Sequence, residues 1–80
     1  MDSVQLIAIA KIRVNHKQAR KVSQEKVQAH CESLEQGEDL YPVDVHLLND
    51  GTFTIAGNGR HRFFAYLYSG YKNIPAIVHR

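Results

Sequence analysis

The sharpest constraint on the fold is the short run Gly57-Asn58-Gly59, which separates a strand pattern from a helix pattern. Residues 52–56 are rich in β-formers and predict a strand, whereas residues 60–69 predict a helix that Gly70 ends. Small residues let the chain turn sharply between the two elements. The helical spacing predicts a core face made of Phe64, Leu67, Tyr68 and Tyr71.

The residues before this unit predict a hairpin. Val43–Leu47 alternates apolar and polar residues, which is typical of a strand with one buried face. Asp50-Gly51 favours a two-residue hairpin turn, in which both central residues need positive φ. Phe53 and Ile55 of the returning strand should then face the same side.

Two further strands are predicted at the ends of the chain. Residues 4–9 are rich in β-formers, and residues 74–78 form a short apolar run. Pro75 suits the first position of a strand or a sheet edge, because it cannot donate a ladder hydrogen bond. The polar and basic residues 12–22 predict an ordered connection across the surface.

A helix is predicted over residues 24–36. Ser23 can cap it by accepting a hydrogen bond from a free N–H of the first turn. Gly37 can end it in the left-handed conformation. The apolar face of this helix comprises Val27, Cys31 and Leu34.

The predicted order is therefore β-α-β-β-α-β, an α+β fold with a small mixed sheet packed against helices. With 80 residues, the chain fits one domain over residues 1–80. Its net charge of +2 is too small to establish a nucleic-acid partner by itself. The distribution is more informative, because basic residues cluster at 16–21 and at 60–62.

The sequence also bears on the cellular setting. Cys31 is the only cysteine, so an internal disulfide is excluded and no zinc spacing exists. The first residues lack a signal-peptide pattern, and no apolar run approaches the roughly 18 residues that a membrane span needs. We therefore expect a cytoplasmic protein with no membrane partner.

The first turn of the second helix is the candidate site. Helix starts leave N–H groups without partners, and the helix dipole adds positive potential there. Gly59 lets a ligand approach the backbone, and Arg60, His61 and Arg62 add donors for phosphate oxygens. The alternative is a solvated turn, although cations at this end cost roughly 0.3–1 kcal/mol each without an anion.

This site also carries a family resemblance. Gly59–Phe63, Gly-Arg-His-Arg-Phe, resembles the Gly-Cys-His-Arg-Tyr motif of sulfiredoxins and the Gly-Arg-His-Arg variants of ParB-like proteins. Similar segments elsewhere are Asn15–Arg20 (ParB Asn-Pro-x-Gln-Pro-Arg), Lys26–Gln28, Tyr41–Val45 and Ile74–Ala76. Nearly the whole chain therefore resembles the ParB/sulfiredoxin superfamily, which includes ParB-like nuclease domains.

The resemblance implies a nucleotide, ATP or CTP with or without Mg²⁺, bound at the helix start. Gly59, His61 and Arg62 match its phosphate-binding positions. Lys26 matches a nucleotide-contacting lysine of sulfiredoxin, and Ser33 stands where a threonine contact lies. Together with His30, these two residues fall at i, i+4 and i+7 on one helix face.

The departures from the family matter as much as the matches. Arg60 replaces the reactive cysteine of sulfiredoxins, and Cys31 on a predicted core face cannot substitute for it, so reductase activity is not expected. In ParB, the position of Arg60 carries a glutamate that helps to hold the metal. A basic residue there should weaken metal binding and strengthen the binding of bare phosphate.

Three functions remain open at this point. The first is nucleotide or phosphoanion binding at residues 59–62. The second is a ParB-like nuclease or phosphotransferase with His61 as the catalytic acid or base. The third is a non-catalytic module that binds DNA, another nucleic acid, a protein or a second copy, with Lys17, Arg20 and Lys21 contacting phosphates. The scattered histidines predict no metal site.

Overall fold

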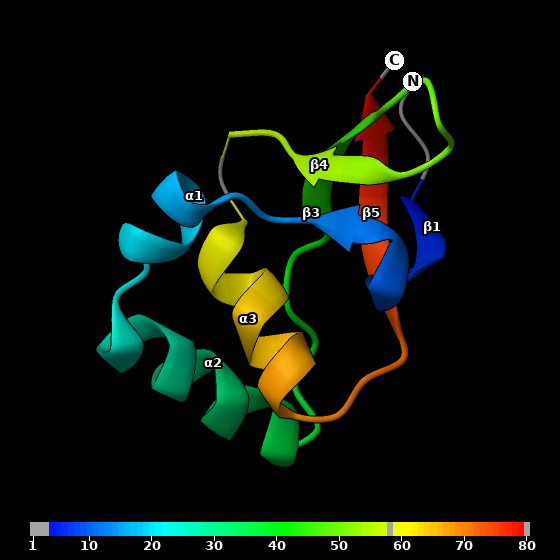
Figure 1. Cartoon of the computed structure of the whole chain (residues 1–80). Helices are drawn as coiled ribbons and strands as arrows, with labels where there is room; N and C mark the ends of the chain where they lie inside the picture. The colour runs from blue at the N-terminus through cyan, green and yellow to red at the C-terminus, as the bar shows by residue number, and fades with distance from the viewer. Residues whose placement is uncertain (1–3, 58, 80) are drawn as a thin grey trace.

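The computed structural model describes residues 4–57 and 59–79 (Figure 1). Its elements are β1 (Val4–Ala8), the 3-10 turn η1 (Ile9–Lys11), β2 (Ile12–Arg13), α1 (His16–Arg20), α2 (Gln24–Glu35), β3 (Val43–Leu47), β4 (Phe53–Ile55), α3 (Arg60–Tyr68) and β5 (Asn73–His79). The predicted succession of strand, helix, hairpin, helix and strand is confirmed. Asn58, in the predicted turn before α3, lies outside the described residues.

The strands form one mixed sheet, as predicted, in the order β1-β5-β3-β4-β2. The β1–β5 and β3–β4 pairs are antiparallel, whereas β3–β5 and β2–β4 are parallel. In Figure 1, α3 lies between the sheet and α2. The central strand is β3, and Gly59 at the start of α3 lies against Val43 at the N-terminal end of β3.

The core lies between the sheet and α3. Val43 and Val45 of β3 and Ile74 of β5 are fully buried, as the alternating pattern of β3 predicts. Phe63 and Tyr66 of α3 complete the same cluster from the helix side. The apolar contact between α3 and these central strands therefore fixes the helix on the sheet.

The predicted core face of α3 is wrong by one position. The buried residues are Phe63, Ala65 and Tyr66, whereas Leu67, Tyr68 and Tyr71 are 42%, 61% and 41% exposed, and Phe64 is partly buried. The physical reason is that α3 is covered on two sides. Phe63 and Tyr66 pack on the sheet, while Ala65 faces α2, where its carbonyl lies 3.7 Å from Cys31 Sγ.

The hairpin between β3 and β4 also differs from the predicted two-residue turn. Leu48 N–H donates to Thr52 O at 2.8 Å, so the loop comprises residues 49–51. Only Gly51 has positive φ, at +84°. Asp50 Oδ1 accepts from the N–H and the hydroxyl of Thr52, at 3.0 and 2.6 Å, which stabilises the longer loop.

The connection over residues 12–22 holds more regular structure than the sequence predicted. Residues 12–13 form the edge strand β2, which pairs with β4, and residues 16–20 form α1. Asn15 and Gln18 form a capping box at the start of α1. Gln18 Nε2 also donates to Ile55 O at 3.1 Å, which ties α1 to the end of β4.

Pro75 does not occupy the predicted first or edge position. It lies inside β5, an interior strand, and stands opposite Leu6 of β1. The register with β3 begins one residue later, at Val43 and Ala76. The missing proline N–H therefore falls just beyond the end of the β3–β5 ladder.

The predicted cap and stop of α2 are confirmed, although the helix ends at Glu35 and Cys31 of the predicted core face is only partly buried. Ser23 Oγ accepts from Lys26 N–H, and Gly37 follows the last turn with φ +80°. Val27 is buried, and Leu34 packs against the core from the same helix. None of the helices in the described part of the chain is long and apolar enough to cross a membrane.

Gly59 allows α3 to begin against β3. It has φ +127°, and a Cβ at this position would lie 3.0 Å from Val43 Cγ1. We expect Gly59→Ala to lower the free energy of unfolding by about 3 kcal/mol, from backbone strain plus overpacking. Gly57→Ala is the matched control, because Gly57 also has positive φ but a Cβ there meets nothing within 4 Å. That control should lose about 1 kcal/mol in urea unfolding; equal losses would contradict the packing argument.

Candidate functional site

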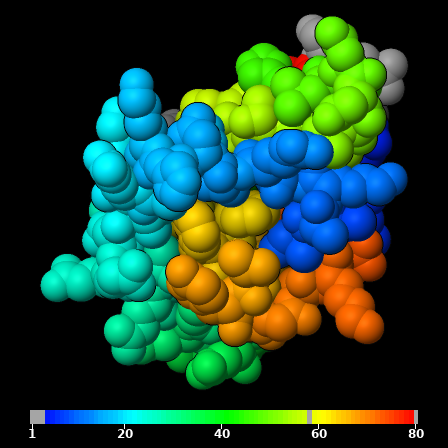
Figure 2. Space-filling view, viewed as in Figure 1, coloured from blue at the N-terminus to red at the C-terminus, as the bar shows by residue number. Residues whose placement is uncertain are grey.

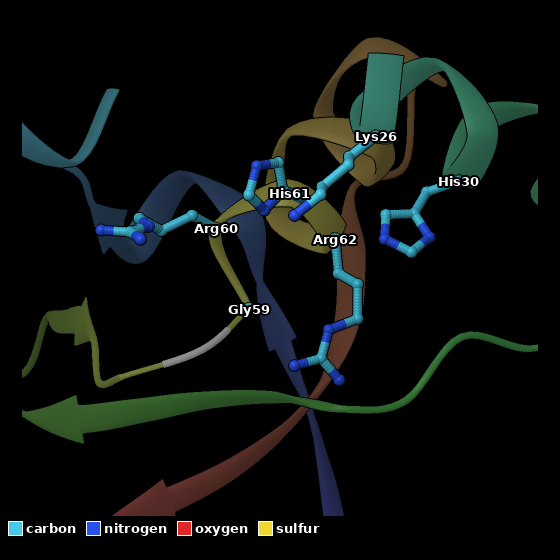
Figure 3. Close-up of a pocket in the computed structure, with 6 residues that line it drawn as sticks. All are labelled: Lys26, His30, Gly59, Arg60, His61 and Arg62. Carbon is cyan, nitrogen blue, oxygen red and sulfur yellow. The ribbon is translucent and has the colours of Figure 1, made fainter. Parts of the chain in front are cut away.

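A cavity of about 320 Å³ opens at the start of α3 (Figure 3). Its lining residues are Lys26, His30, Gly59, Arg60, His61 and Arg62. The structure thus brings Lys26 of α2 together with the whole predicted phosphate-binding motif. The cavity is lined by residues from two helices, so it is not formed by the start of α3 alone.

Two residues of the predicted polar stripe on α2 differ from expectation. Ser33 lies outside the cavity lining, and its hydroxyl donates to Ala29 O at 3.2 Å within its own helix. His30 lines the cavity; the sequence placed it on the same helix face as Lys26 but not among the predicted site residues. Its spacing of four residues from Lys26 was the signal that could have identified it.

Arg62 is fixed by the chain segment that leads into β3. Its Nη1 donates to Pro42 O at 3.1 Å. Within residues 4–57 and 59–79, no carboxylate forms an ion pair with this guanidinium. The remaining N–H groups of Arg62 are therefore available to another acceptor while the side chain stays in place.

Lys26 and Arg60 supply the other full positive charges of the cavity. Figure 3 shows Lys26 extending from α2 toward the ring of His61, whereas Arg60 extends away from Arg62 and His30. Neither side chain has a hydrogen-bond or ion-pair partner among the described residues. Both are thus free to contact a ligand without breaking an internal bond.

His61 links the two helices that form the cavity. Its Nε2 accepts a hydrogen bond from Ser23 N–H at 2.9 Å, so the proton of the neutral ring lies on Nδ1. Burial lowers the pKa of His61 below its ordinary value near 6.5, and the charges of Lys26, Arg60 and His30 lower it further. A general base acting through Nε2 would have to break the bond to Ser23, so the catalytic role of His61 stays a prediction.

The backbone adds donors to the same cavity. Phe63 N–H donates to Gly59 O at 2.8 Å, so the N–H groups of residues 60–62 precede the first bond of α3. Gly59 provides no side-chain cap for them. Together with the helix dipole, these groups favour a negatively charged ligand at this position.

The other predicted basic residues lie away from this cavity. Lys17, Arg20 and Lys21 are exposed on or directly after α1 and do not line it. A second, apolar hollow of about 390 Å³ lies between α1 and α3, and Figure 2 shows α3 recessed there. The role of these three residues in nucleic-acid binding stays a prediction.

The hydrogen bond between Ser23 and His61 predicts a pH-dependent stability. The pKa of His61 is lower in the folded state than in the unfolded state. Neutral His61 therefore contributes its full stabilisation above the unfolded-state pKa near 6.5, and this stabilisation is lost as pH falls through the folded-state pKa. His61→Gln places an amide oxygen near the position of Nε2 and cannot titrate.

Between pH 7 and about pH 5, we expect the free energy of unfolding to fall more for wild type than for His61→Gln. Urea unfolding at several pH values measures this difference. The two proteins differ only at residue 61, so the difference between their pH profiles reports on that side chain and its neighbours. Parallel pH profiles would contradict the assignment of a neutral, accepting His61.

Solved structures of other proteins share this fold. Sulfiredoxin from Arabidopsis thaliana has a TM-score of 0.81 at 24% identity, covering 98% of this chain and 85% of that one. C-terminally truncated ParB from Caulobacter crescentus, complexed with CTP-gamma-S, has a TM-score of 0.76 at 22% identity, covering 98% and 44%. SbnI from Staphylococcus aureus, also C-terminally truncated, has a TM-score of 0.79 at 18% identity, covering 96% and 30%.

These likenesses establish the ParB/sulfiredoxin-like fold, and the chain spans less than half of the ParB and SbnI chains that it matches. No curated protein matches the chain in sequence. The family model described as the ParB N-terminal domain, however, matches residues 1–80. This chain therefore belongs to the ParB N-terminal domain family.

Proposed function

We propose that this domain binds the phosphate groups of a nucleotide in the cavity at the start of α3. The observation that carries the proposal is the lining itself, in which Lys26, Arg60 and Arg62 border one cavity and none of the lining residues is acidic. Positive charges that border one cavity, with no carboxylate beside them, favour a negatively charged ligand there. Phosphate oxygens would satisfy these charges and the free N–H groups together.

Each part of the cavity would have a distinct task. Gly59 leaves the backbone open at the helix start, where phosphate oxygens can accept from the N–H groups of residues 60–62. Arg62, held by Pro42 O, would present its remaining N–H groups in a fixed direction. Lys26 would close the cavity from α2, and Nδ1–H of His61 would add a neutral donor.

The relatives support a nucleotide over inorganic phosphate as the ligand. The Caulobacter ParB structure contains CTP-gamma-S, and the family match covers this whole chain. Both ATP and CTP remain candidate nucleotides. A cytoplasmic setting, where both nucleotides are abundant, agrees with the single cysteine.

Lys26→Gln tests the proposal without disturbing the fold, because Lys26 is exposed and has no partner among the described residues. We expect the Kd for the preferred nucleotide to rise about five- to tenfold, as expected for loss of one charge near phosphate. Isothermal titration with ATP, CTP and their diphosphates measures this. Lys72→Gln, an equal charge change at an exposed residue outside the cavity, should retain the wild-type Kd.

Substitution of Arg62 should weaken nucleotide binding more than substitution of Lys26, but it also changes a contact within the fold. Arg62→Ala should abolish measurable binding, whereas Arg62→Lys should retain part of it, because lysine keeps the charge but not the planar pair of donors. Thermal unfolding of both variants is needed, since either change removes the bond to Pro42 O. Equal binding by wild type and Arg62→Ala, or no binding by wild type, would refute the proposed function.

Nucleic acid is a second candidate ligand, through a different surface. Lys17, Arg20 and Lys21 are exposed, and no ion pair engages them within the described residues. If they contact a phosphate backbone, affinity for single-stranded DNA should fall steeply with salt and should be lost on Lys17→Gln/Arg20→Gln/Lys21→Gln. Fluorescence anisotropy of labelled DNA at several salt concentrations measures this, and an affinity that does not change with salt would contradict contact with the phosphate backbone.

A further inference from the structure

We propose that this cavity binds its phosphate chain free of divalent metal, and that Mg²⁺ weakens the binding. The inference rests on the proposed nucleotide site and adds the form in which the nucleotide is recognised. It follows from the chemistry of the lining side chains and from the positions of the carboxylates of the chain.

The lining residues do not fit Mg²⁺. This ion takes oxygen ligands in near-octahedral geometry, commonly one or two carboxylates together with phosphate oxygens and water. The side chains that line the cavity are one ammonium, two guanidinium and two imidazole groups, and none of them carries an oxygen. Lysine and arginine only donate, and Nε2 of His61 already accepts from Ser23.

None of the carboxylates within residues 4–57 and 59–79 lines the cavity. Asp50 accepts from Thr52 and pairs with Arg13, and Asp44 pairs with His79 at 3.0 Å. Glu25 is next to Lys26 in α2, but adjacent helical residues point to different sides, and Glu25 does not line the cavity. Among the described residues, no group of at least three histidine, cysteine, aspartate or glutamate side chains could hold a metal ion.

Mg²⁺ and the donor groups of the cavity would therefore compete for the same phosphate oxygens. A Mg²⁺ ion bound to the phosphate chain neutralises part of its charge and occupies oxygens that Arg60, Arg62 and the helix N–H groups would contact. Both effects reduce the attraction to a site with an unpaired ammonium and two guanidinium groups. The metal-free nucleotide should thus bind about tenfold more tightly than its Mg²⁺ complex.

Titration of the whole chain with ATP and with CTP, in EDTA and in saturating MgCl₂, tests this inference. Ionic strength is matched with NaCl, because screening alone weakens charge-dependent binding. The expected result is a Kd about tenfold lower in EDTA. Equal affinity, or binding that requires Mg²⁺, would overturn the inference and leave the proposed function intact. Absence of binding in both buffers would overturn both.

Substitutions at Arg60 change the chemical groups that line the cavity. Arg60→Glu introduces a carboxylate into the lining, so affinity in EDTA should fall and Mg²⁺ should now strengthen binding. Arg60→Gln removes the charge without adding a metal ligand, and should only reduce the inhibition by Mg²⁺. Lys72→Glu makes the same charge reversal outside the cavity and should behave as wild type. Undiminished inhibition by Mg²⁺ in Arg60→Glu would show that the lining does not decide metal dependence.

Discussion

The close approach of Gly59 to Val43 positions everything else at this site. Val43 is fully buried in β3, and a side chain at residue 59 would lie 3.0 Å from it, so only glycine lets α3 begin directly on the sheet. Arg62 then extends along the same contact to Pro42, the residue before β3. The helix start, the strand start and the guanidinium therefore form one rigid corner, in which the cavity geometry follows from backbone packing.

Polar side chains in and around the site also hold the fold together. His61 accepts from Ser23 and so ties α3 to the N-cap of α2, while Gln18 donates to Ile55 O and ties α1 to β4. Variants of such residues change stability and binding together. Lys26 and Arg60 have no internal partners among the described residues, so their effects on a ligand can be measured more cleanly.

Local signals in the sequence predicted local structure well. Ser23 and Gly37 bound α2 because capping depends on only a few adjacent residues. Features that depend on distant parts of the chain were missed. The buried face of α3 is set by coverage from both the sheet and α2, and β2 exists because β4 provides a partner for two residues with little strand pattern. Periodicity alone cannot distinguish adjacent helical stripes when a helix is covered on two sides.

The same contrast between local and long-range signals applies to the candidate site. Residues 59–62 are contiguous, so sequence alone could group them, and the resemblance to sulfiredoxin brought in Lys26. Ser33, however, lies about 10 Å further along α2 than Lys26, beyond the cavity, and its hydroxyl is bonded within the helix. Residue 60 is where this chain departs from sulfiredoxins and from ParB itself, in which the resemblance places a cysteine and a glutamate. Because Gly59, His61 and Arg62 are tied to the backbone around them, exchange at residue 60 would alter the chemistry offered to a phosphate chain without moving the place where it binds.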